Sequence, residues 1–339
     1  MTSTGLSRNL LAKNARAKQA AAKRQVTANG RFAAARARRC AERERLGALR
    51  DRQIRSGTKK RYLIHMRAFF QWMEKTGRSY PARCEDMDLI CMAWAEHLWH
   101  EGDAKSILNN SLCGLAFFCE GLRGKLCGSW KLYKAWGKSE VVHRAPPLPM
   151  LFAQALAGEF ARQGFCSAAV LILVAHHCML RTCELLSLRT GDCAAGKDGI
   201  VLTLRETKMG QRVGIHQQTT VSDPWLVSRL RRAVKATPSG HLLIGMTPAR
   251  FRALWSRSKT ETGVPQKYTP YSLRRGGATA MFTCCGSFDK VADTGRWASI
   301  SACRLYITTG LQELAGADEL DLLEQTMAKH VRYLSILDW

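Results

Sequence analysis

The chain has 339 residues, of which 46% are hydrophobic, and its formal net charge is +25. This length and apolar fraction are enough for two folded domains with separate cores, which excludes a solvated, unstructured polymer. So large a positive charge calls for a polyanionic partner. Nucleic acid is the first candidate and an acidic membrane surface the second.

The 13 cysteines do not form a disulfide or zinc framework in the sequence. None are spaced as Cys-x-x-Cys, and most stand in apolar segments, where a free cysteine packs as a small hydrophobic residue. No signal peptide is visible, so we expect a reducing, intracellular compartment, no structural metal and no cofactor. The longest apolar run, Cys166 to Ala175, is too short to cross a bilayer and predicts a buried helix.

The N-terminal segment is basic and poor in large apolar residues. Residues 1–50 hold 13 Lys and Arg against two acids. Because such a segment cannot bury enough surface to fix its conformation, we expect a basic arm over residues 1–55 that is disordered or helical only under some conditions. Phosphate contact, nuclear import, an organelle transit peptide and a merely solvated tail are all open interpretations of this arm.

Residues 56–138 have the pattern of a bundle of four short helices with a basic surface. In Thr58–Lys75, large side chains recur every three or four residues: Tyr62, His65, Met66, Phe69, Phe70 and Met73. Asp86 or Asp88 is expected to cap a second helix that runs through Leu98. Two further helices are expected over Ala104–Phe118 and Trp130–Trp136.

A proline-rich segment, residues 139–149, separates this bundle from the rest of the chain. Three of its last four residues are prolines, which remove backbone donors and disfavour helix. We therefore expect an extended interdomain linker. Helices are predicted near 149–162 and 165–179, followed by a short helix capped by Thr182, with Arg181 at the turn and Glu184 one turn further on.

The strongest strand signal follows this short helix. Ile200–Leu204 and Arg212–Ile215 flank a turn with Lys208 at its tip, which predicts a β-hairpin. Further helices are expected over Asp223–Val234, Pro248–Thr260, 270–285, Asp289–Thr294 and Ser299–Thr309. Residues 311–339 carry six acids against two Lys and Arg on an apolar helical pattern.

Five side chains of this second half are suited to act on one phosphate group: Arg181, Lys208, Arg274, Trp297 and Tyr306. Guanidinium groups are always charged and bind phosphate bidentately, a lysine can donate a proton, and an indole N–H can donate a hydrogen bond. Trp297 follows Arg274 by 23 positions, and Tyr306 follows Trp297 by nine. This spacing is more informative than any one of the residues.

The motifs around these residues resemble those of the tyrosine recombinases, or phage-type integrases. Leu180-Arg181-x-x-Glu184-Leu185 is similar to the first arginine box of that family, and Ser272-Leu273-Arg274-Arg275-Gly276-Gly277 to the second. Lys208 matches the hairpin lysine, and Trp297 and Tyr306 follow at the family's spacing. The tryptophan at position 297 resembles the branch that contains the Cre recombinase. Most other members of the family have a second histidine at this position.

The resemblance covers roughly residues 55–330 and implies a mainly α-helical fold with a small β-hairpin or sheet. It implies a helical core-binding domain over 56–138, the linker over 139–149 and an α+β catalytic domain over 150–317. The acidic segment 318–339 is expected to dock on a neighbouring protomer. The implied partners are double-stranded DNA and further copies of the chain, as a tetramer on two sites, with no membrane. The implied location is the nucleus or another compartment that contains DNA.

The implied reaction is site-specific cutting and rejoining of DNA without a metal. Tyr306 would attack a phosphodiester and become esterified to it. Arg181 and Arg274 would bind the phosphate, supported by Glu184, and Trp297 would donate a hydrogen bond. Lys208 would protonate the departing 5′ oxygen.

One position departs from the family pattern. The second box usually begins with histidine, and this chain has Tyr271 there. A phenol can donate to a phosphate oxygen but is a poor general base near pH 7. Two alternatives therefore stay open. The first is a DNA-binding protein of the same fold with impaired catalysis, and the second is a relaxase that resembles type IB topoisomerases.

Each assigned residue also has a purely structural interpretation. Arg181 and Glu184 could form a plain buried ion pair, and Trp297 could be a core residue. Lys208 could be a solvated turn residue, with Lys197 as a weaker competitor for its role. The rival nucleophiles are Tyr268, Tyr271 and Tyr333, and the adjacent His176 and His177 are expected to be packed, hydrogen-bonded histidines.

Overall fold

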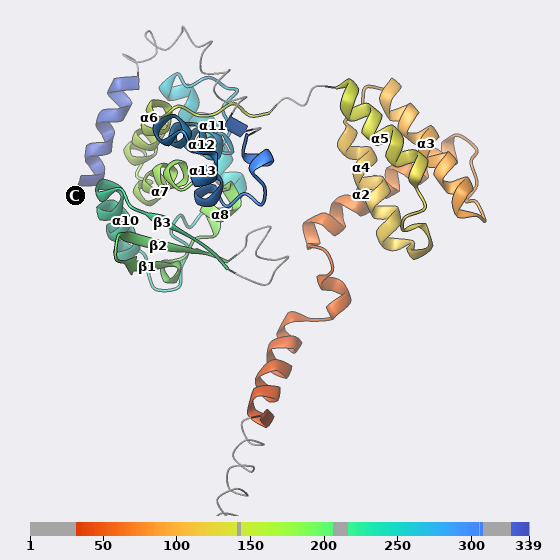
Figure 1. Cartoon of the computed structure of the whole chain (residues 1–339), viewed down its shortest axis with the longest axis horizontal. Helices are drawn as coiled ribbons and strands as arrows, with labels where there is room; N and C mark the ends of the chain where they lie inside the picture. Colours follow the sequence, from red (N-terminus) through yellow and green to blue (C-terminus); the bar gives the residue numbers. More distant parts are fainter. Residues whose placement is uncertain (1–31, 141–143, 206–215, 305, 308–326, 339) are drawn as a thin grey trace, which may run out of the picture. The chain divides into compact units, whose positions relative to one another are not determined.

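A computed structural model describes residues 32–140, 144–205, 216–304, 306–307 and 327–338 (Figure 1). The chain folds as two compact units, Met1–Val142 and His143–Trp339. The division falls inside residues 139–149, where the sequence predicts a linker. The predicted mainly helical fold with a small sheet is confirmed.

The first unit is helical. Its described elements are a helix over 32–46, η1 (Leu49–Arg52), α2 (Ser56–Lys75), α3 (Cys84–His100), α4 (Lys105–Phe118), η2 (Glu120–Leu122) and α5 (Cys127–Ser139). The last four α-helices occupy the four stretches in which the sequence predicts helices. Residues 32–52 of the basic arm are largely helical although none of their side chains is buried, which corresponds to the helical alternative expected for this segment. Alanine-rich sequence favours a helix even where no core supports it.

The core of the first unit lies where α2, α3 and α4 meet. Phe69 is fully buried, and its ring packs 6.1 Å from Trp72 and 5.9 Å from Trp94, measured between ring centroids. Leu63 and Ile64, which lie off the predicted apolar face of α2, are exposed. The three- and four-residue periodicity therefore identified the buried face of this helix.

Asp88 caps a different helix from the one predicted. The residue that precedes α3 is Arg83, which pairs with Asp86 at 3.1 Å. Asp88 instead accepts hydrogen bonds from the backbone nitrogens of Gly128 and Ser129, at 2.7 and 2.9 Å, in the first turn of α5. The Ser129 hydroxyl also donates to it at 2.6 Å. The predicted cap of α3 is therefore wrong, because the free N–H groups that Asp88 satisfies lie forty residues away in sequence.

The second unit contains more elements. They are α6 (Met150–Arg162), α7 (Cys166–His177), α8 (Thr182–Ser187), η3 (Thr190–Asp192), β1 (Cys193–Gly196), β2 (Gly199–Leu204), β3 (Gln217–Val221), α10 (Pro224–Ala236), α11 (Pro248–Thr262), α12 (Ser272–Cys285), α13 (Phe288–Gly295), helical residues 300–304, 306–307 and 327–332, and η4 (Tyr333–Asp338). Thr182 begins α8, and the residue in the capping position is Arg181, not Thr182 as predicted.

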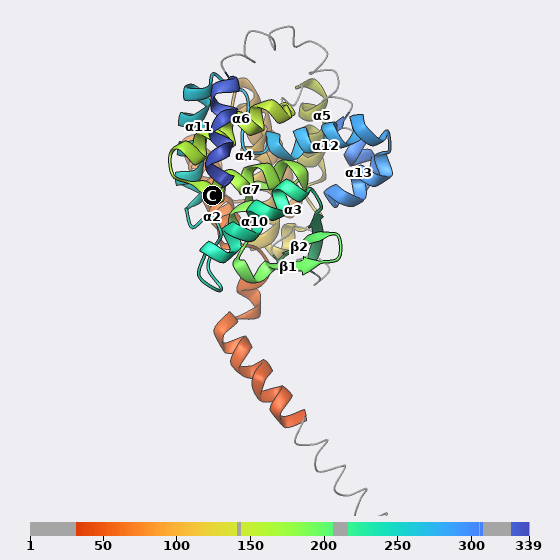
Figure 2. The same ribbon diagram turned by 90° about the vertical axis from the view of Figure 1, so that its left-hand side faces the viewer.

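The centre of this unit is α7, the predicted buried helix, in which every residue from 168 to 176 is buried. It packs against α6, α10 and α12, while α11 packs against α6 and α13 against α12 (Figures 1 and 2). No helix in the described part of the chain combines the length and apolar character that a bilayer crossing requires. The arrangement brings α8, α12 and α13 together at one side of α7.

The sheet has three antiparallel strands in the order β1-β2-β3. Ile200 pairs with Val221 and Leu204 with Gln217. Alternate residues of β2 are buried, because successive side chains of a strand point to opposite faces of the sheet. The predicted hairpin partner Arg212–Ile215 and the tip residue Lys208 lie outside the described residues. On one side β2 pairs with β3, Gln217–Val221, and on the other with β1, which was not predicted from the sequence.

The C-terminal residues 327–338 pack on their own unit, along α6 (Figure 2). Met327 and Leu337 are buried in its core. A Cβ on Gly158 would lie 1.9 Å from the carbonyl oxygen of His330, so the two backbones touch. The expected docking on a neighbouring protomer therefore stays a prediction for residues 318–326, which lie outside the described residues, while residues 327–338 contribute to the core of their own unit.

Replacing Asp88 by alanine tests the long-range cap. We expect Asp88→Ala to lower the free energy of unfolding of the first unit by about 1–2 kcal/mol, because two backbone N–H groups lose their acceptor. Asp86→Ala is the matched control and should lower it by less than about 0.5 kcal/mol, because it removes only an exposed ion pair. Denaturant unfolding, with hydrogen exchange of the α5 amides, measures both. Equal losses in the two variants would contradict the assignment.

Candidate active site

The Arg-Arg-Gly-Gly sequence brings the first turns of α12 into the interior of the second unit. Residues 272–279 are all buried. A Cβ on Gly276 would lie 1.9 Å from the carbonyl oxygen of Leu148, and one on Gly277 would lie 1.9 Å from that of His176. The two glycines therefore allow the backbone to approach α7 and residue 148 closely. Because of this close approach, Arg274 and Arg275, which precede the glycines, lie in the interior of the unit.

Arg274 is held by two backbone carbonyls. Its Nη1 donates to Met179 and its Nη2 to Gly295, the latter at 2.6 Å. The guanidinium carbon lies 4.1 Å from the centroid of the Trp297 ring, within the range of a cation–π contact. The same ring fills the space beside Gly295, where a Cβ would lie 1.7 Å from it. The Gly-Arg-Trp turn therefore orients Arg274 from two sides.

A buried carboxylate binds two guanidinium groups and acts as a nearby charge on a third. We call these four residues the Glu184 cluster: Glu184, Arg181, Arg274 and Arg296. Glu184 accepts from the backbone nitrogen of Arg181 at 2.9 Å, from its Nη1 at 2.5 Å and from Nη2 of Arg296 at 3.1 Å. Burial, and then the charges of Arg181 and Arg296, lower the pKa of Arg274 to about 10. Arg274 therefore stays charged at neutral pH.

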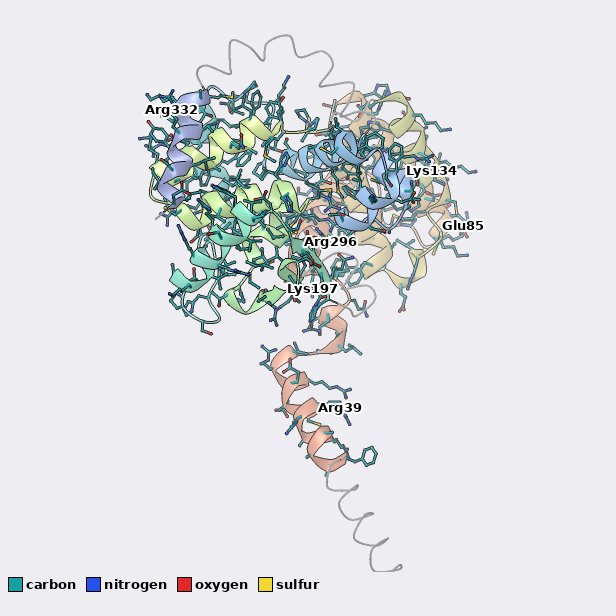
Figure 3. The ribbon with its side chains drawn as sticks, turned by 60° about the vertical axis from the view of Figure 1, so that its left-hand side comes forward. Arg39, Glu85, Lys134, Lys197, Arg296 and Arg332 are labelled. Atoms are coloured by element: carbon teal, nitrogen blue, oxygen red, sulfur yellow. The ribbon has the colours of Figure 1, made fainter. Side chains whose placement is uncertain are left out.

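Arg296 is a part of the site that sequence reasoning missed. It lies at the end of α13 in a left-handed conformation, with φ of 58° (Figure 3). Besides Glu184, its guanidinium donates to the carbonyls of Cys178 at 3.2 Å and Thr294 at 3.0 Å. Burial lowers its pKa, against the opposing effect of Glu184. The sequence feature that could have identified Arg296 is its position between two motif residues, Gly295 and Trp297.

Tyr306 lies beside this cluster on the last described helix before residue 327. Its neighbours Cys303 and Ile307 are fully buried in a small core formed with α12 and α13, which fixes the face that Tyr306 presents. Its hydroxyl lies 2.7 Å from the hydroxyl of Tyr271, and its ring centroid lies 5.5 Å from that of Trp297. The tyrosine is thus within hydrogen-bonding distance of Tyr271, the residue at the position where the sequence resemblance predicts a histidine.

Tyr271 is part of the site but is not suited to accept a proton. Burial and the hydrogen bond with Tyr306 raise the pKa of Tyr271 to about 12, although Arg274 and Arg181 act in the opposite direction. The phenol therefore stays protonated throughout the neutral range. Its side chain is also partly exposed, so that it contacts both Tyr306 and solvent.

The predicted residues fall into three groups. Six come together: Arg181, Glu184, Tyr271, Arg274, Trp297 and Tyr306. Lys208 lies outside the described residues, and its competitor Lys197 is exposed in the turn between β1 and β2 (Figure 3). Of the rival nucleophiles, Tyr268 packs its ring against Phe152 in the core, and Tyr333 lies in η4 beside His330.

His176 is a packed histidine, in agreement with its structural interpretation. Its Nε2 lies 3.1 Å from the carbonyl oxygen of Leu148. Burial lowers its pKa to about 4, so the ring is neutral at pH 7 and its N–H donates to that carbonyl. In the described part of the chain, no three His, Cys, Asp or Glu side chains gather as a possible metal site.

The fold is similar to that of several solved DNA recombinases. The XerH site-specific recombinase bound to its difH substrate has a TM-score of 0.51 at 12% identity, covering 77% of this chain and 80% of that one. The chain has the tyrosine recombinase fold. The Tn1549 transposon integrase with circular intermediate DNA has a TM-score of 0.56 at 16% identity, covering 75% of this chain and 90% of that one.

A lambda integrase dimer bound to a core site shares the tyrosine recombinase fold as well. Its TM-score is 0.52 at 14% identity, and the match covers 76% of this chain and 73% of that one. No protein-family model matches the sequence, and a search of the curated proteins finds no match either. The Cre-like branch stays a prediction.

The buried histidine predicts a pH dependence of stability. Between pH 6.5, its ordinary pKa, and about 4, the unfolded chain binds a proton at His176 that the folded chain does not, so stability falls as the pH falls. We expect this group to remove about 3 kcal/mol between pH 7 and pH 4. His176→Gln, which keeps an N–H donor but cannot titrate, should lack that loss. Denaturant unfolding at each pH compares the two chains, and parallel pH profiles would refute the expectation.

Proposed function

We propose that the protein is a site-specific DNA recombinase or integrase, which cuts and rejoins DNA through a 3′-phosphotyrosine link at Tyr306. The observation that carries the proposal is the position of the Tyr306 hydroxyl. It lies 2.7 Å from Tyr271, whose own hydroxyl is close enough to Arg274 and Arg181 for both charges to act on its pKa. A nucleophile and two phosphate-binding groups therefore meet in a tyrosine recombinase fold.

The charge of the Glu184 cluster suits a phosphodiester. Its three guanidiniums and one carboxylate leave two positive charges in excess within the cluster. Attack on a phosphodiester gathers further negative charge on its non-bridging oxygens, which preorganised cationic donors stabilise without reorganisation. Arg181 has 23% of its side chain exposed and is the member of the cluster best placed to meet DNA. Arg274 and Arg296 are more deeply buried, and their positive charges add to the electrostatic potential at Arg181.

The proposed chemistry exchanges one phosphoester bond for another. The Tyr306 oxygen bonds to phosphorus while the bond from phosphorus to the 5′ oxygen breaks, and the 5′ oxygen takes up a proton. Lys208 is the proposed donor of that proton. The Tyr306 proton passes to the Tyr271 hydroxyl as Tyr271 releases its own to solvent, because a phenol with a pKa of about 12 can relay a proton but cannot hold one as a base. Rejoining reverses these steps with a 5′ hydroxyl as nucleophile.

DNA binding is supported by charge and by surface composition. The net charge is +25, and exposed arginines line α10 and α11, among them Arg231, Arg252 and Arg257. Such contacts give an affinity that falls steeply with salt. Residues 1–55 would add non-specific affinity. By analogy with the fold, we propose assembly as a tetramer on two sites, in a nucleus or another compartment that contains DNA.

Tyr271 supports a second candidate, a DNA-binding protein of this fold with little or no cleavage activity. Its raised pKa removes it as a general base at neutral pH. The hydrogen bond to Tyr306 nevertheless keeps the two hydroxyls in line for proton transfer. Only a direct assay of covalent bond formation separates the two candidates.

Loss of covalent DNA in Tyr306→Phe tests the function. The full chain is incubated with a randomised library of nicked duplexes and denatured, and the bound DNA is recovered. We expect a covalent adduct that falls roughly 100-fold or more in Tyr306→Phe, because the phenol oxygen forms the bond. Tyr80→Phe, at an exposed site in the first unit, and Tyr333→Phe are controls that should keep it.

The recovered DNA then identifies the target sequence and the outcome. Joining of two duplexes indicates a recombinase, whereas relaxation of a supercoiled circle without joining indicates a relaxase. A wild-type chain that binds DNA but gives no adduct would show that the second candidate is correct.

Restoring the family's histidine should speed cleavage. We expect Tyr271→His to raise the rate of adduct formation near pH 7 by about 10-fold or more, because imidazole can accept the Tyr306 proton. The rate should then rise with pH through about 6.5, where the imidazole loses its own proton. Tyr271→Phe, which removes the relay, should be slower than wild type. A Tyr271→His chain with the wild-type rate and pH profile would contradict the proposed relay.

A further inference from the structure

Arg275, the neighbour of Arg274, joins two distant segments at the candidate active site. It is fully buried, and its Nη1 donates to the carbonyl oxygen of Ala145. Its Nη2 donates to the carbonyl oxygen of Tyr306 at 3.5 Å, and its guanidinium carbon lies 5.8 Å from the centroid of the Tyr306 ring. One side chain therefore connects residue 145 to the backbone of the proposed nucleophile.

The segment around Ala145 is itself firmly placed. We call residues 144–149 the strap. The backbone nitrogen of Leu148 donates to Ser272 at the start of α12, at 3.0 Å, and its carbonyl accepts from His176 at 3.1 Å. The Leu148 side chain is fully buried. Ala145 is thus a fixed point relative to α7 and α12, and Arg144 beside it places its guanidinium carbon 5.9 Å from the Tyr306 ring.

An arginine is an unusual choice for such a buried position. Burying a guanidinium costs several kcal/mol unless its donors are satisfied, and an apolar side chain of similar volume would often pack at least as well. What the arginine adds is a planar fork that reaches two acceptors in fixed directions. Here the acceptors are the carbonyls of Ala145 and Tyr306.

We propose that Arg275 is a positioning residue, which holds the Tyr306 backbone at a set distance from the strap and so directs the Tyr306 hydroxyl toward the phosphate. The inference rests on the proposed role of Tyr306 as nucleophile. Reaction at phosphorus requires the attacking oxygen to be in line and close, and a misplacement of about 1 Å can lower the rate by roughly 100-fold. The strap is held in place by α7 and α12, and Arg275 links the Tyr306 backbone to it.

Arg275→Lys tests the proposal, because lysine keeps the charge but lacks the fork. We expect single-turnover adduct formation at saturating DNA to slow by about 10- to 100-fold, with the dissociation constant for DNA unchanged within about 3-fold. Arg275→Gln, which is neutral, is a second variant that should also slow. Lys259→Met is the matched control: Lys259 is likewise buried and donates to one backbone carbonyl, that of Gln266 at 2.7 Å. It should lower stability without slowing cleavage.

A second readout does not depend on cleavage. The chain has seven tyrosines, so the 19F spectrum of protein labelled with 3-fluorotyrosine can be assigned with single Tyr→Phe variants. In Arg275→Lys the resonance of residue 306 should shift or broaden, and in Lys259→Met it should not. If the wild-type chain forms no adduct but this resonance responds, the proposed function fails and the positioning role stands.

Three outcomes would overturn the positioning role. The first is an Arg275→Lys chain that cleaves at the wild-type rate with an unchanged resonance. The second is slow cleavage with an unchanged resonance, which would mean that Arg275 acts through its charge or through DNA contact. The third is failure of both Arg275 variants to fold while Lys259→Met folds, which would mean that Arg275 serves the structure alone.

Discussion

Glu184 is the one charge on which the arrangement of the site depends. Its carboxylate is buried and accepts from Arg181 on one side and Arg296 on the other, and Arg274 shares the carbonyl of Met179 with Arg296. Without it, three guanidiniums would face one another at short range in a low-dielectric interior. Because one carboxylate cannot neutralise three cations, the cluster keeps two positive charges in excess, which favours binding of an anion. The helices α8, α12 and α13 meet around this cluster.

Sequence reasoning identified what short-range patterns determine. Periodicity located the helices of both units, and the spacing from Arg274 to Trp297 and Tyr306 identified residues that do come together. Local patterns did not predict contacts between residues that are far apart in sequence. Asp88 accepts from backbone N–H groups of a helix forty residues away, and Arg275 donates to Ala145, 130 residues before it. No local preference encodes such contacts, because they follow from how whole helices pack.

The presence of Tyr271 where a histidine was expected changes which group would accept the proton of Tyr306. A histidine would accept the proton of the nucleophile by itself. In the proposed reaction, two phenols in contact leave that task to solvent, and the electrostatic field of the arginines supplies more of the stabilisation. The pairing also occupies the Tyr306 hydroxyl before DNA arrives. The proposed reaction therefore requires the Tyr306 hydroxyl to exchange this hydrogen-bond partner when DNA binds.

The carbonyl of Leu148 occupies the place that a side chain on residue 276 would fill, and it has a practical consequence for protein engineering. The strap is part of the packing of α12, although it precedes the first helix of the second unit. A fragment of the second unit that begins at Met150 would leave an open slot beside the paired glycines and remove the Ala145 carbonyl that accepts from Arg275. Chimeras that join this unit to another protein should therefore place the junction before Arg144.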